Sequence, residues 1–308
     1  MVSRWYHLGV DKVVSLWYHY IEGDGNMTKL SDKEIIRIYH DEYLKGVSAY
    51  QLEEKYNLYK SYLYRCFKRL ELPLRSNAIN SKKYIFDERY FEEIDSANKA
   101  YWLGFIYADG YILSKRKQSN RVLGISLNIK DKKHLEKFND CLRSNVEIKT
   151  YVESSGFGKG SQYCRVLYAS QKLTDDLMKH GVYEHKSCIL SKPDIPEEYI
   201  KDFIRGYFDG DGSIWKQDKG TQFNISIVGT DELLTFIQNH LLEIGIISRH
   251  YPLNKRKENQ VVSNFKFGGN NLTYNFLHYL YEDSEIYLDR KMELYLELKN
   301  KINSHPIQ

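Results

Sequence analysis

Two aspartates stand in matching surroundings and are the residues of this chain best suited to chemistry. Asp109 lies in a stretch from 100 to 112, Asp211 lies at the same place in a similar stretch from 202 to 214, and a glycine follows each aspartate. Both stretches are predicted to be helices that end at that glycine. Because the C-terminus of a helix already carries partial negative charge, an aspartate there is locally unfavourable. A divalent cation would offset this cost, since carboxylates, backbone carbonyls and water are the ligands that Mg²⁺ prefers.

The two predicted helices are expected to cross closely. Gly104 is followed four positions later by Ala108, and Gly206 by Gly210, so each helix has one face with little side-chain bulk. Glycine inside a helix costs about 1 kcal/mol relative to alanine, and close approach of two backbones is a reason to keep it. Crossing would bring the two carboxylates together, and a pair of metal ions held there suits phosphodiester hydrolysis. The alternative is that each Asp-Gly pair is only a turn after a helix, but two copies with matched glycine spacing favour a site.

The sequence after each stretch repeats as well. Alternating apolar residues predict two strands, a helix, two further strands and a last helix in each half, so that each half is αββαββα. Two such halves imply a pseudo-twofold arrangement, with Asp131 and Asp231 as the expected caps of the middle helices. The first half is expected to have strands ending near 117 and over 121–130, 146–154 and 161–170, with helices over 131–142 and up to 180; the second half is expected to have strands over 213–217, 222–228, 248–255 and 261–267, with helices over 231–245 and 271–282.

Residues 27–80 are predicted to form a separate all-α domain with helices over 32–43, 48–56 and 60–70. Asn57 fits the turn between the second and third helices, because asparagine tolerates the left-handed conformation. Two short helices joined by a tight turn, the second of them basic, are typical of a helix-turn-helix domain. A three-helix packing module with no role in DNA binding is the alternative. We expect Ile35, Ile36, Ile38 and Tyr39 to face inward in the first helix, and Lys60, Ser61, Tyr62 and Arg65 to contact DNA.

The remaining boundaries follow from composition. Residues 1–26 fit no domain and are interpreted as an extension, with Met27 as an alternative start of the protein. Residues 81–97 are polar enough to be a linker with one short apolar patch. The two repeats are expected over 98–199 and 200–302, with a tail over 303–308.

The paired stretches resemble the signature of the LAGLIDADG homing endonucleases. Residues 102–110 and 204–212 correspond to its nine positions, and the likeness extends over about residues 98 to 302. Tyr107 replaces the first acid of the signature and Arg205 replaces a small residue, and both departures are minor for metal binding. The resemblance implies an α+β fold, in which two pseudo-twofold αββαββα repeats form a DNA-binding sheet saddle, preceded by a small all-α helix-turn-helix domain.

The same resemblance implies a metal site and a reaction. Mg²⁺ or Mn²⁺ would be bound by the carboxylates of Asp109 and Asp211 and by the backbone carbonyls just before them, those of Ala108 and Gly210. Cleavage would be a staggered break of both DNA strands, with Asp109 and Asp211 as catalytic residues.

Family members also place a catalytic lysine after the last helix of each repeat, near the scissile phosphates. Lys186 and Lys291 stand at those positions. The alternative is that both are surface lysines making nonspecific contacts. A polar residue that the family has near the end of the second strand is not evident here, because Ile129 and Gly229 stand there.

Basic segments and outward strand positions are the expected DNA contacts. Basic segments suit phosphates, although solvated loops are the alternative. If Ile225 and Ile227 face the helices, the side chains between them face away and suit base edges in the major groove. A slip of one residue in register would exchange the two faces. The expected contacts are Lys115, Arg116, Lys117, Lys255, Arg256 and Lys257 on the basic segments, and Asn128, Arg165, Gln222, Asn224, Asn264 and Lys266 on the strands.

Bulk composition is that of a soluble globular protein, with 42% hydrophobic and 28% charged residues. The chain has no apolar run long enough for a membrane span and no signal peptide, and its four cysteines are scattered, so an intracellular location is expected. The sequence therefore predicts a monomeric, site-specific endonuclease acting on double-stranded DNA. An intron RNA maturase and a DNA-binding regulator with decayed catalysis are the alternatives, and both intact acids argue against the regulator.

Overall fold

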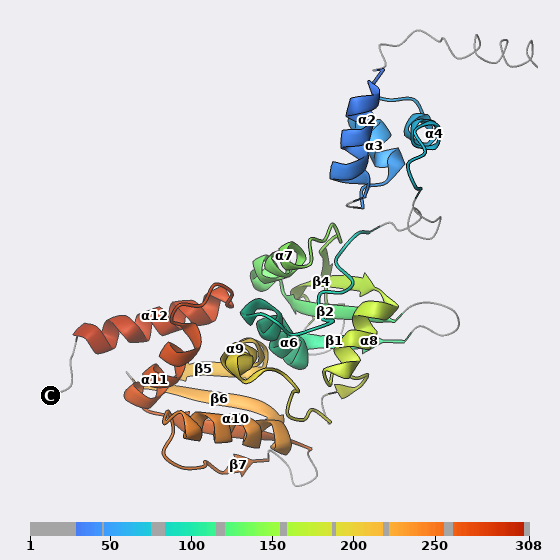
Figure 1. Ribbon diagram of the computed structural model, residues 1–308. Helices are drawn as coiled ribbons and strands as arrows, with labels where there is room; N and C mark the ends of the chain where they lie inside the picture. Colours follow the sequence, from blue (N-terminus) through green and yellow to red (C-terminus); the bar gives the residue numbers. More distant parts are fainter. Residues whose placement is uncertain are drawn as a thin grey trace, which may run out of the picture. The chain divides into compact units, whose positions relative to one another are not determined.

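The computed structural model describes residues 29–44, 46–74, 84–114, 121–154, 159–186, 189–217, 222–255 and 261–304. The chain divides into two compact units, 1–83 and 84–308, and Figure 1 labels most of their helices and strands. No helix among the described residues is long and apolar enough to cross a membrane. Several predictions fall outside the described residues: the extension 1–26, most of the tail, and the basic residues Lys115, Arg116, Lys117, Arg256 and Lys257.

The N-terminal unit is helical, as predicted. Ser31 and Ser48 each form a capping box that begins a helix, and Asn57 adopts the left-handed conformation in the turn. Ile35 and Tyr39 are buried, but Ile36 is 39% exposed, so its predicted inward position is wrong. One residue step turns the side chain about 100° around a helix, away from the core face. The unit comprises α2 (Asp32–Ile38), the π-helix η1 (Tyr39–Tyr43), α3 (Ala49–Lys55) and α4 (Tyr62–Arg69).

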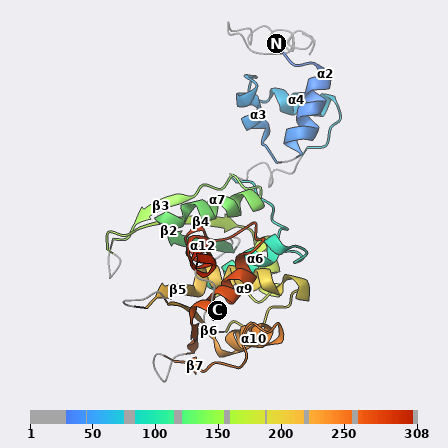
Figure 2. The ribbon, with the colours of Figure 1, turned by 90° about the vertical axis from the view of Figure 1, so that its left-hand side faces the viewer.

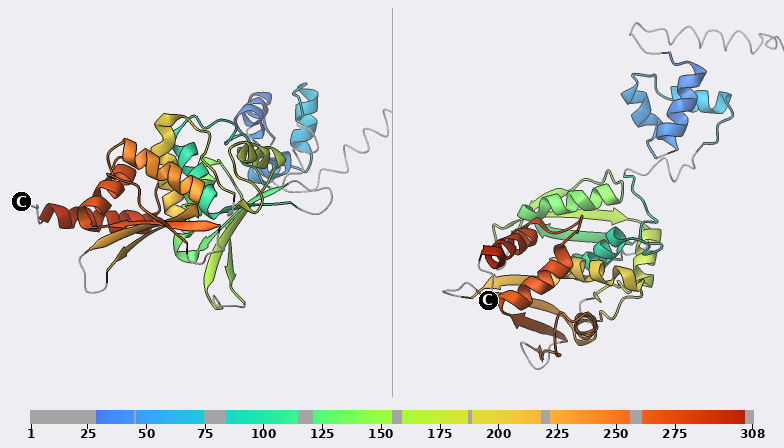
Figure 3. Two further views of the ribbon diagram at one scale, coloured as in Figure 1. Left: turned by 90° about the horizontal axis from the view of Figure 1, so that it is seen from below. Right: turned by 60° about the vertical axis from the view of Figure 1, so that its left-hand side comes forward.

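The larger unit contains two αββαββα repeats, which confirms the predicted fold. Each repeat has a four-stranded antiparallel sheet, ordered β1-β2-β4-β3 in the first and β5-β6-β8-β7 in the second. The helices gather on one side of the two sheets (Figure 3). The first repeat consists of α6 (Ala97–Asp109), β1 (Gly110–Leu113), β2 (Val122–Asn128), the 3-10 turn η2 (Ile129–Asp131), α7 (Lys132–Cys141), β3 (Lys149–Val152), β4 (Gln162–Ala169) and α8 (Gln171–Lys179). The second repeat consists of η4 (Glu197–Tyr199), α9 (Ile200–Asp211), β5 (Gly212–Lys216), β6 (Phe223–Thr230), α10 (Asp231–Glu243), β7 (Leu253–Asn254), β8 (Val262–Gly268) and α11 (Asn270–Tyr281).

A further helix, α12 (Asp289–Ser304), follows the second repeat and packs on α11 (Figures 1 and 2). It was not predicted. Its first turn is tied to the first repeat, because Lys137 lies 2.6 Å from Asp289 and Arg290 lies 3.2 Å from Asp131. The first turn of α12, which carries Lys291, therefore connects the second repeat to the first.

The caps of the middle helices differ from the prediction. Thr230, not Asp231, caps α10, because its hydroxyl accepts the backbone N–H of Leu233. Asp231 is the first helical residue, where its charge suits the helix N-terminus, and its carboxylate accepts a hydrogen bond from Ser263. Asp131 occupies the cap position of α7 but makes no side-chain cap bond.

The expected linker is shorter than residues 81–97. Tyr90, Phe91 and Ile94 are buried in the core of the larger unit, and the backbone of Asp87 bonds that of Leu142 at 2.8 Å. The prediction failed because the charged residues around these three, such as Glu92 and Glu93, mask a short apolar cluster that adds to the core.

Candidate active site and nucleic-acid interface

The helices α6 and α9 cross in backbone contact, as predicted from their glycines. A Cβ built on Gly104 would overlap the carbonyl oxygen of Phe203, and one built on Gly206 would overlap the carbonyl oxygen of Tyr101. Only glycine permits this approach. The crossing places the C-terminal ends of both helices side by side, and a strand leaves each end directly, β1 after Asp109 and β5 after Asp211.

Asp109 and Asp211 meet at these helix ends. A Cβ built on Gly210, one residue before Asp211, would lie 3.2 Å from the carboxylate of Asp109. Both side chains are half-buried. Burial, reinforced by the negative charge of Asp211, raises the pKa of Asp109 to about 6, and burial also raises the pKa of Asp211. The structure thus brings together the two carboxylates that the sequence singled out, at the electrostatic cost expected of a cation site.

Lys186 and Lys291 lie beside these carboxylates and are 5% and 1% exposed, so the interpretation of both as surface lysines is wrong. The Lys186 ammonium donates to the carbonyls of Tyr107 at 2.6 Å and Ala108 at 2.8 Å. Lys291 donates to the carbonyls of Asp209 at 2.9 Å and Gly212 at 2.7 Å, and also to that of Phe208. Burial lowers the pKa of each lysine to about 8. Each lysine therefore compensates the negative end of one signature helix.

The donor atoms at this site suit a hard divalent cation. Two carboxylates and main-chain carbonyls offer oxygen only, which is the preference of Mg²⁺ and Mn²⁺. Lys186 occupies one lone pair of the Ala108 carbonyl, and a carbonyl oxygen has two. Within the described part of the chain no cluster of three His, Cys, Asp or Glu side chains could hold a metal. An ion bound here would complete its shell with water or substrate oxygens.

Asp209 is a buried carboxylate that sequence reasoning missed. It accepts hydrogen bonds from the hydroxyls of Tyr101 and Tyr281, each at 2.6 Å, and from the backbone N–H of Leu288 at 2.8 Å. Tyr101 belongs to the first repeat, while Leu288 precedes α12 and its Lys291. This network fixes the segment carrying Lys291 against both signature helices. The acid in the second signature could have pointed to it, although its partners lie far away in sequence.

The two signature departures have structural partners. Arg205 is 2% exposed, pairs with Asp202 at 2.7 Å, and donates to the carbonyls of Ile286 and Leu280 at 3.0 and 3.3 Å. Arg205 is therefore bonded to the segment between α11 and α12, to which Asp209 is also bonded through Leu288. Tyr107, which stands where the second repeat has Asp209, donates to the carbonyl of His180. The two repeats therefore support their lysines by different contacts.

The ends of the second strands also differ from the prediction. Ile129 lies in the turn after β2, and Gly229 precedes the last residue of β6. The strands end at Asn128 and Thr230, which are both polar. In the sequence, Asn128 follows Asp109 at the same interval at which Thr230 follows Asp211. Asn128 accepts the backbone N–H of Lys130, and Thr230 donates to the carbonyl of Leu190. A polar residue is thus present at each strand end, one position away from where we expected it.

The predicted strand register is correct. Ile225 and Ile227 are fully buried in the core, and the residues between and beside them lie on the opposite face, which we call the outer face. Asn264 lies on that face but is only 7% exposed, because it accepts a hydrogen bond from Ser226. Asn224 and Arg165 are half-buried. The remaining predicted residues, Asn128, Gln222 and Lys266, are exposed.

The outer face also carries apolar side chains that were not predicted. Trp215 is 39% exposed and pairs in register with Asn224, while Leu113 and Leu167 are 50% and 41% exposed on the first sheet. Alternation along the strands could have identified them, since they share the parity of the predicted polar residues. Were DNA to lie on this face, these apolar groups would suit thymine methyl groups.

The other predicted DNA contacts, which lie outside the outer face, differ in their exposure and in their partners. Lys255 lies 3.4 Å from Asp231. In the N-terminal unit, Lys60, Ser61 and Arg65 are exposed, and Tyr62 is half-buried with its hydroxyl bonded to the backbone of Leu30 at 3.2 Å.

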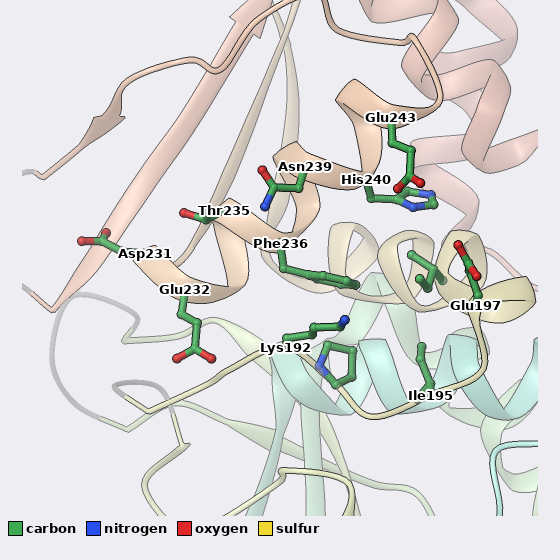
Figure 4. A pocket seen from close by; sticks show the side chains of 12 residues that line it. Lys192, Ile195, Glu197, Asp231, Glu232, Thr235, Phe236, Asn239, His240 and Glu243 are labelled. Carbon is green, nitrogen blue, oxygen red and sulfur yellow. The ribbon is translucent and has the colours of Figure 1, made fainter.

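A cavity of about 780 Å³ lies between α10 and the segment that leads into α9 (Figure 4). Its lining includes neither signature aspartate and neither buried lysine. Glu197, Asp231, Glu232 and Glu243 line it, with Lys192 as its lining cation among the described residues. Phosphate would be repelled by these carboxylates, so the cavity does not suit a nucleic acid.

Comparison with known proteins identifies the class. The LAGLIDADG-like domain family matches residues 96–179 and 198–285, which together make up more than half of the chain. The chain belongs to the LAGLIDADG-like domain family. A comparison with curated proteins gave no match.

Solved structures of LAGLIDADG enzymes also match. The homing endonuclease I-GzeII in complex with its DNA target is 12% identical, with a TM-score of 0.47, over 68% of this chain and 93% of that chain. The meganuclease I-CpaMI bound to uncleaved DNA is 11% identical, with a TM-score of 0.46, over 67% and 92%. I-SmaMI bound to an uncleaved DNA target in the presence of calcium ions is 13% identical, with a TM-score of 0.43, over 67% and 93%.

Proposed function

We propose that this chain is a site-specific endonuclease that makes a metal-dependent double-strand break in DNA. The observation that carries the proposal is the pair of half-buried carboxylates, Asp109 and Asp211, at the crossed ends of α6 and α9. Membership of the LAGLIDADG-like domain family supports it, because homing endonucleases carry the same paired signature. The two sheets present polar, basic and apolar side chains on one outer face, as direct readout of base edges requires.

The residues of the chain have distinct roles in this proposal. Asp109 and Asp211, with the carbonyls of Ala108 and Gly210, would hold Mg²⁺ or Mn²⁺. Such ions, when bound, would activate water and stabilise the leaving oxygen. Lys186 and Lys291 keep positive charge beside the carboxylates, close to where a phosphate must come to reach them. Their hydrogen bonds to the helix ends also hold the two carboxylates in place.

The N-terminal unit extends the contact with DNA in this proposal. The exposed Lys60, Ser61 and Arg65 lie at the start of α4, the second helix of a helix-turn-helix pair. Such an added module lengthens the recognised site without taking part in cleavage.

The decisive experiment uses the full chain and the uninterrupted form of the locus that carries its gene. A plasmid bearing that locus, incubated with Mg²⁺, should become linear with staggered ends, while the same plasmid in EDTA or with the locus deleted should stay intact. Tight binding of the locus without any cleavage would contradict the enzyme and favour a DNA-binding regulator. Preferential binding of intron RNA without cleavage of DNA would favour a maturase.

Metal binding should depend on pH through Asp109. Its pKa is raised to about 6, and a carboxyl group must lose its proton to bind an ion. We expect the rise in Tm caused by Mg²⁺ to be small at about pH 5 and complete above about pH 7. Without the ion the sign is opposite: folding raises the pKa of Asp109 from 3.8 to about 6, so its ionisation lowers stability as the pH rises between these two values.

Thermal unfolding with and without Mg²⁺ between about pH 4 and about pH 7 measures both effects. The double variant D109N/D211N should show no Mg²⁺-induced shift at any pH, and it should lose the part of the pH dependence that Asp109 contributes. An equal Mg²⁺-induced shift at pH 5 and pH 7 would show that the ion binds elsewhere.

A further inference from the structure

Arg165 occupies the centre of the outer face of the first sheet. It lies on β4, an inner strand, opposite Ser126 on β2 and Lys149 on β3. All three side chains point to the outer face, because paired residues in an antiparallel sheet share a face. With DNA on the outer face, a guanidinium at the middle of the sheet would be placed to meet base edges rather than the phosphates at the rim.

The Arg165 side chain is held in one orientation. Its Nε donates to the hydroxyl of Ser126 at 2.9 Å, and that hydroxyl lies 3.4 Å from the hydroxyl of Tyr111. The rings of Tyr151 and Tyr163, themselves stacked at 5.3 Å, lie 5.3 and 5.4 Å from the guanidinium. These contacts fix the plane of the group and restrict its rotamers.

The contacts leave the recognition end of the side chain available. Within the described residues no carboxylate pairs with Arg165, and its hydrogen bond there uses Nε alone. The two terminal nitrogens form a planar fork that matches O6 and N7 of guanine in the major groove. A fork oriented before binding loses less conformational entropy when it binds.

We propose that Arg165 is a specificity-determining residue that reads one guanine of the target, with Tyr151, Tyr163 and Ser126 holding its guanidinium. The inference rests on the proposed function, since it requires DNA on the outer face. Lys149 supplies an internal comparison, because it is exposed, lies directly opposite on the edge strand and has the same charge. A flexible ammonium at that edge suits a phosphate contact rather than base readout.

The test is selection from a randomised double-stranded DNA library in Ca²⁺, with the wild-type full chain and with R165A, R165K and K149A. The wild type should select a motif with one guanine that both Arg165 variants no longer require, with discrimination there falling about 10- to 100-fold. K149A should keep the motif and weaken binding equally for all sequences, with a shallower salt dependence.

Atomic substitution in the DNA sharpens the result. Replacing that guanine by 7-deazaguanine removes only the N7 acceptor, and should weaken the wild type but leave R165A unchanged. S126A should lose part of the same discrimination, because it frees Nε. Circular dichroism of each variant shows that the fold is retained, and R165K keeps the charge if R165A unfolds.

The possible failures are distinct. If the wild type selects a motif and both Arg165 variants select it unchanged, or lose affinity uniformly as K149A does, Arg165 does not read a base and the proposed function stands. If the wild type selects no sequence at all, the proposed function fails and this inference fails with it.

Discussion

Replacing Asp211 by asparagine is expected to lower the rate of strand cleavage by about 1,000-fold or more while leaving DNA affinity in Ca²⁺ nearly unchanged. Asparagine keeps the shape of the side chain, so the crossing of α6 and α9 is retained. It removes the negative charge that would hold a divalent ion, and the stabilisation that such an ion gives a phosphoryl transition state is worth several kcal/mol. Single-turnover cleavage of a plasmid target measures the rate, and binding in Ca²⁺ measures the affinity.

A matched control separates the site from a general charge effect. D140N makes the same change on an exposed residue near the end of α7, far in sequence from both signature helices. We expect it to cleave at the wild-type rate. Full activity of D211N would remove Asp211 from the mechanism, and equal loss in both variants would assign the effect to net charge.

The sequence was sufficient to predict the parts of the fold that depend on local pattern. Strand alternation placed Ile225 and Ile227 in the core, and the matched spacing of Gly104 and Gly206 predicted the helix crossing. Both inferences need only periodicity and side-chain size, and repetition within one chain strengthened each of them. The two aspartates followed from the crossing.

Contacts between distant segments could not be predicted in the same way. Asp209 is satisfied by groups from α6, α11 and the segment before α12, and the signature that contains Asp209 gives no sign of these distant partners. A lysine is usually found at the surface, yet Lys291 is buried because its ammonium donates hydrogen bonds to three backbone carbonyls at the end of α9. Burial of a charge depends on the partner that the fold supplies, and the partner is invisible in local sequence.

Competition between neighbouring residues caused the smaller errors. Thr230 and Asp231 are both good caps, and the end of β6 decides in favour of Thr230 because the strand continues through it. The hydroxyl of Ser226 on β6 donates a hydrogen bond to Asn264 on the paired strand β8. Asn264 therefore points to the outer face, as predicted, but is buried there and not available for contact with DNA. Parity gives the face of a strand residue but not its exposure.

Replacing Gly206 by alanine is expected to lower the free energy of unfolding of the larger unit by about 3 kcal/mol or more. A Cβ there would overlap the carbonyl of Tyr101 and approach the backbone N–H of Phe105. These are backbone atoms of a helix, so relief requires α6 to move away as a whole. Because α6 carries Asp109, the same movement would separate the two carboxylates and slow cleavage.

Thermal unfolding measures the loss, which for a domain of this size corresponds to about 6 to 12 °C in Tm. G245A is the control, because a Cβ on Gly245 meets nothing within 4 Å but its φ of +74° strains any other residue. That strain alone should cost about 1 to 2 kcal/mol. A loss in G206A no larger than in G245A would mean that the helices can separate freely. The difference between the two variants therefore measures how firmly the glycine crossing fixes Asp109 beside Asp211.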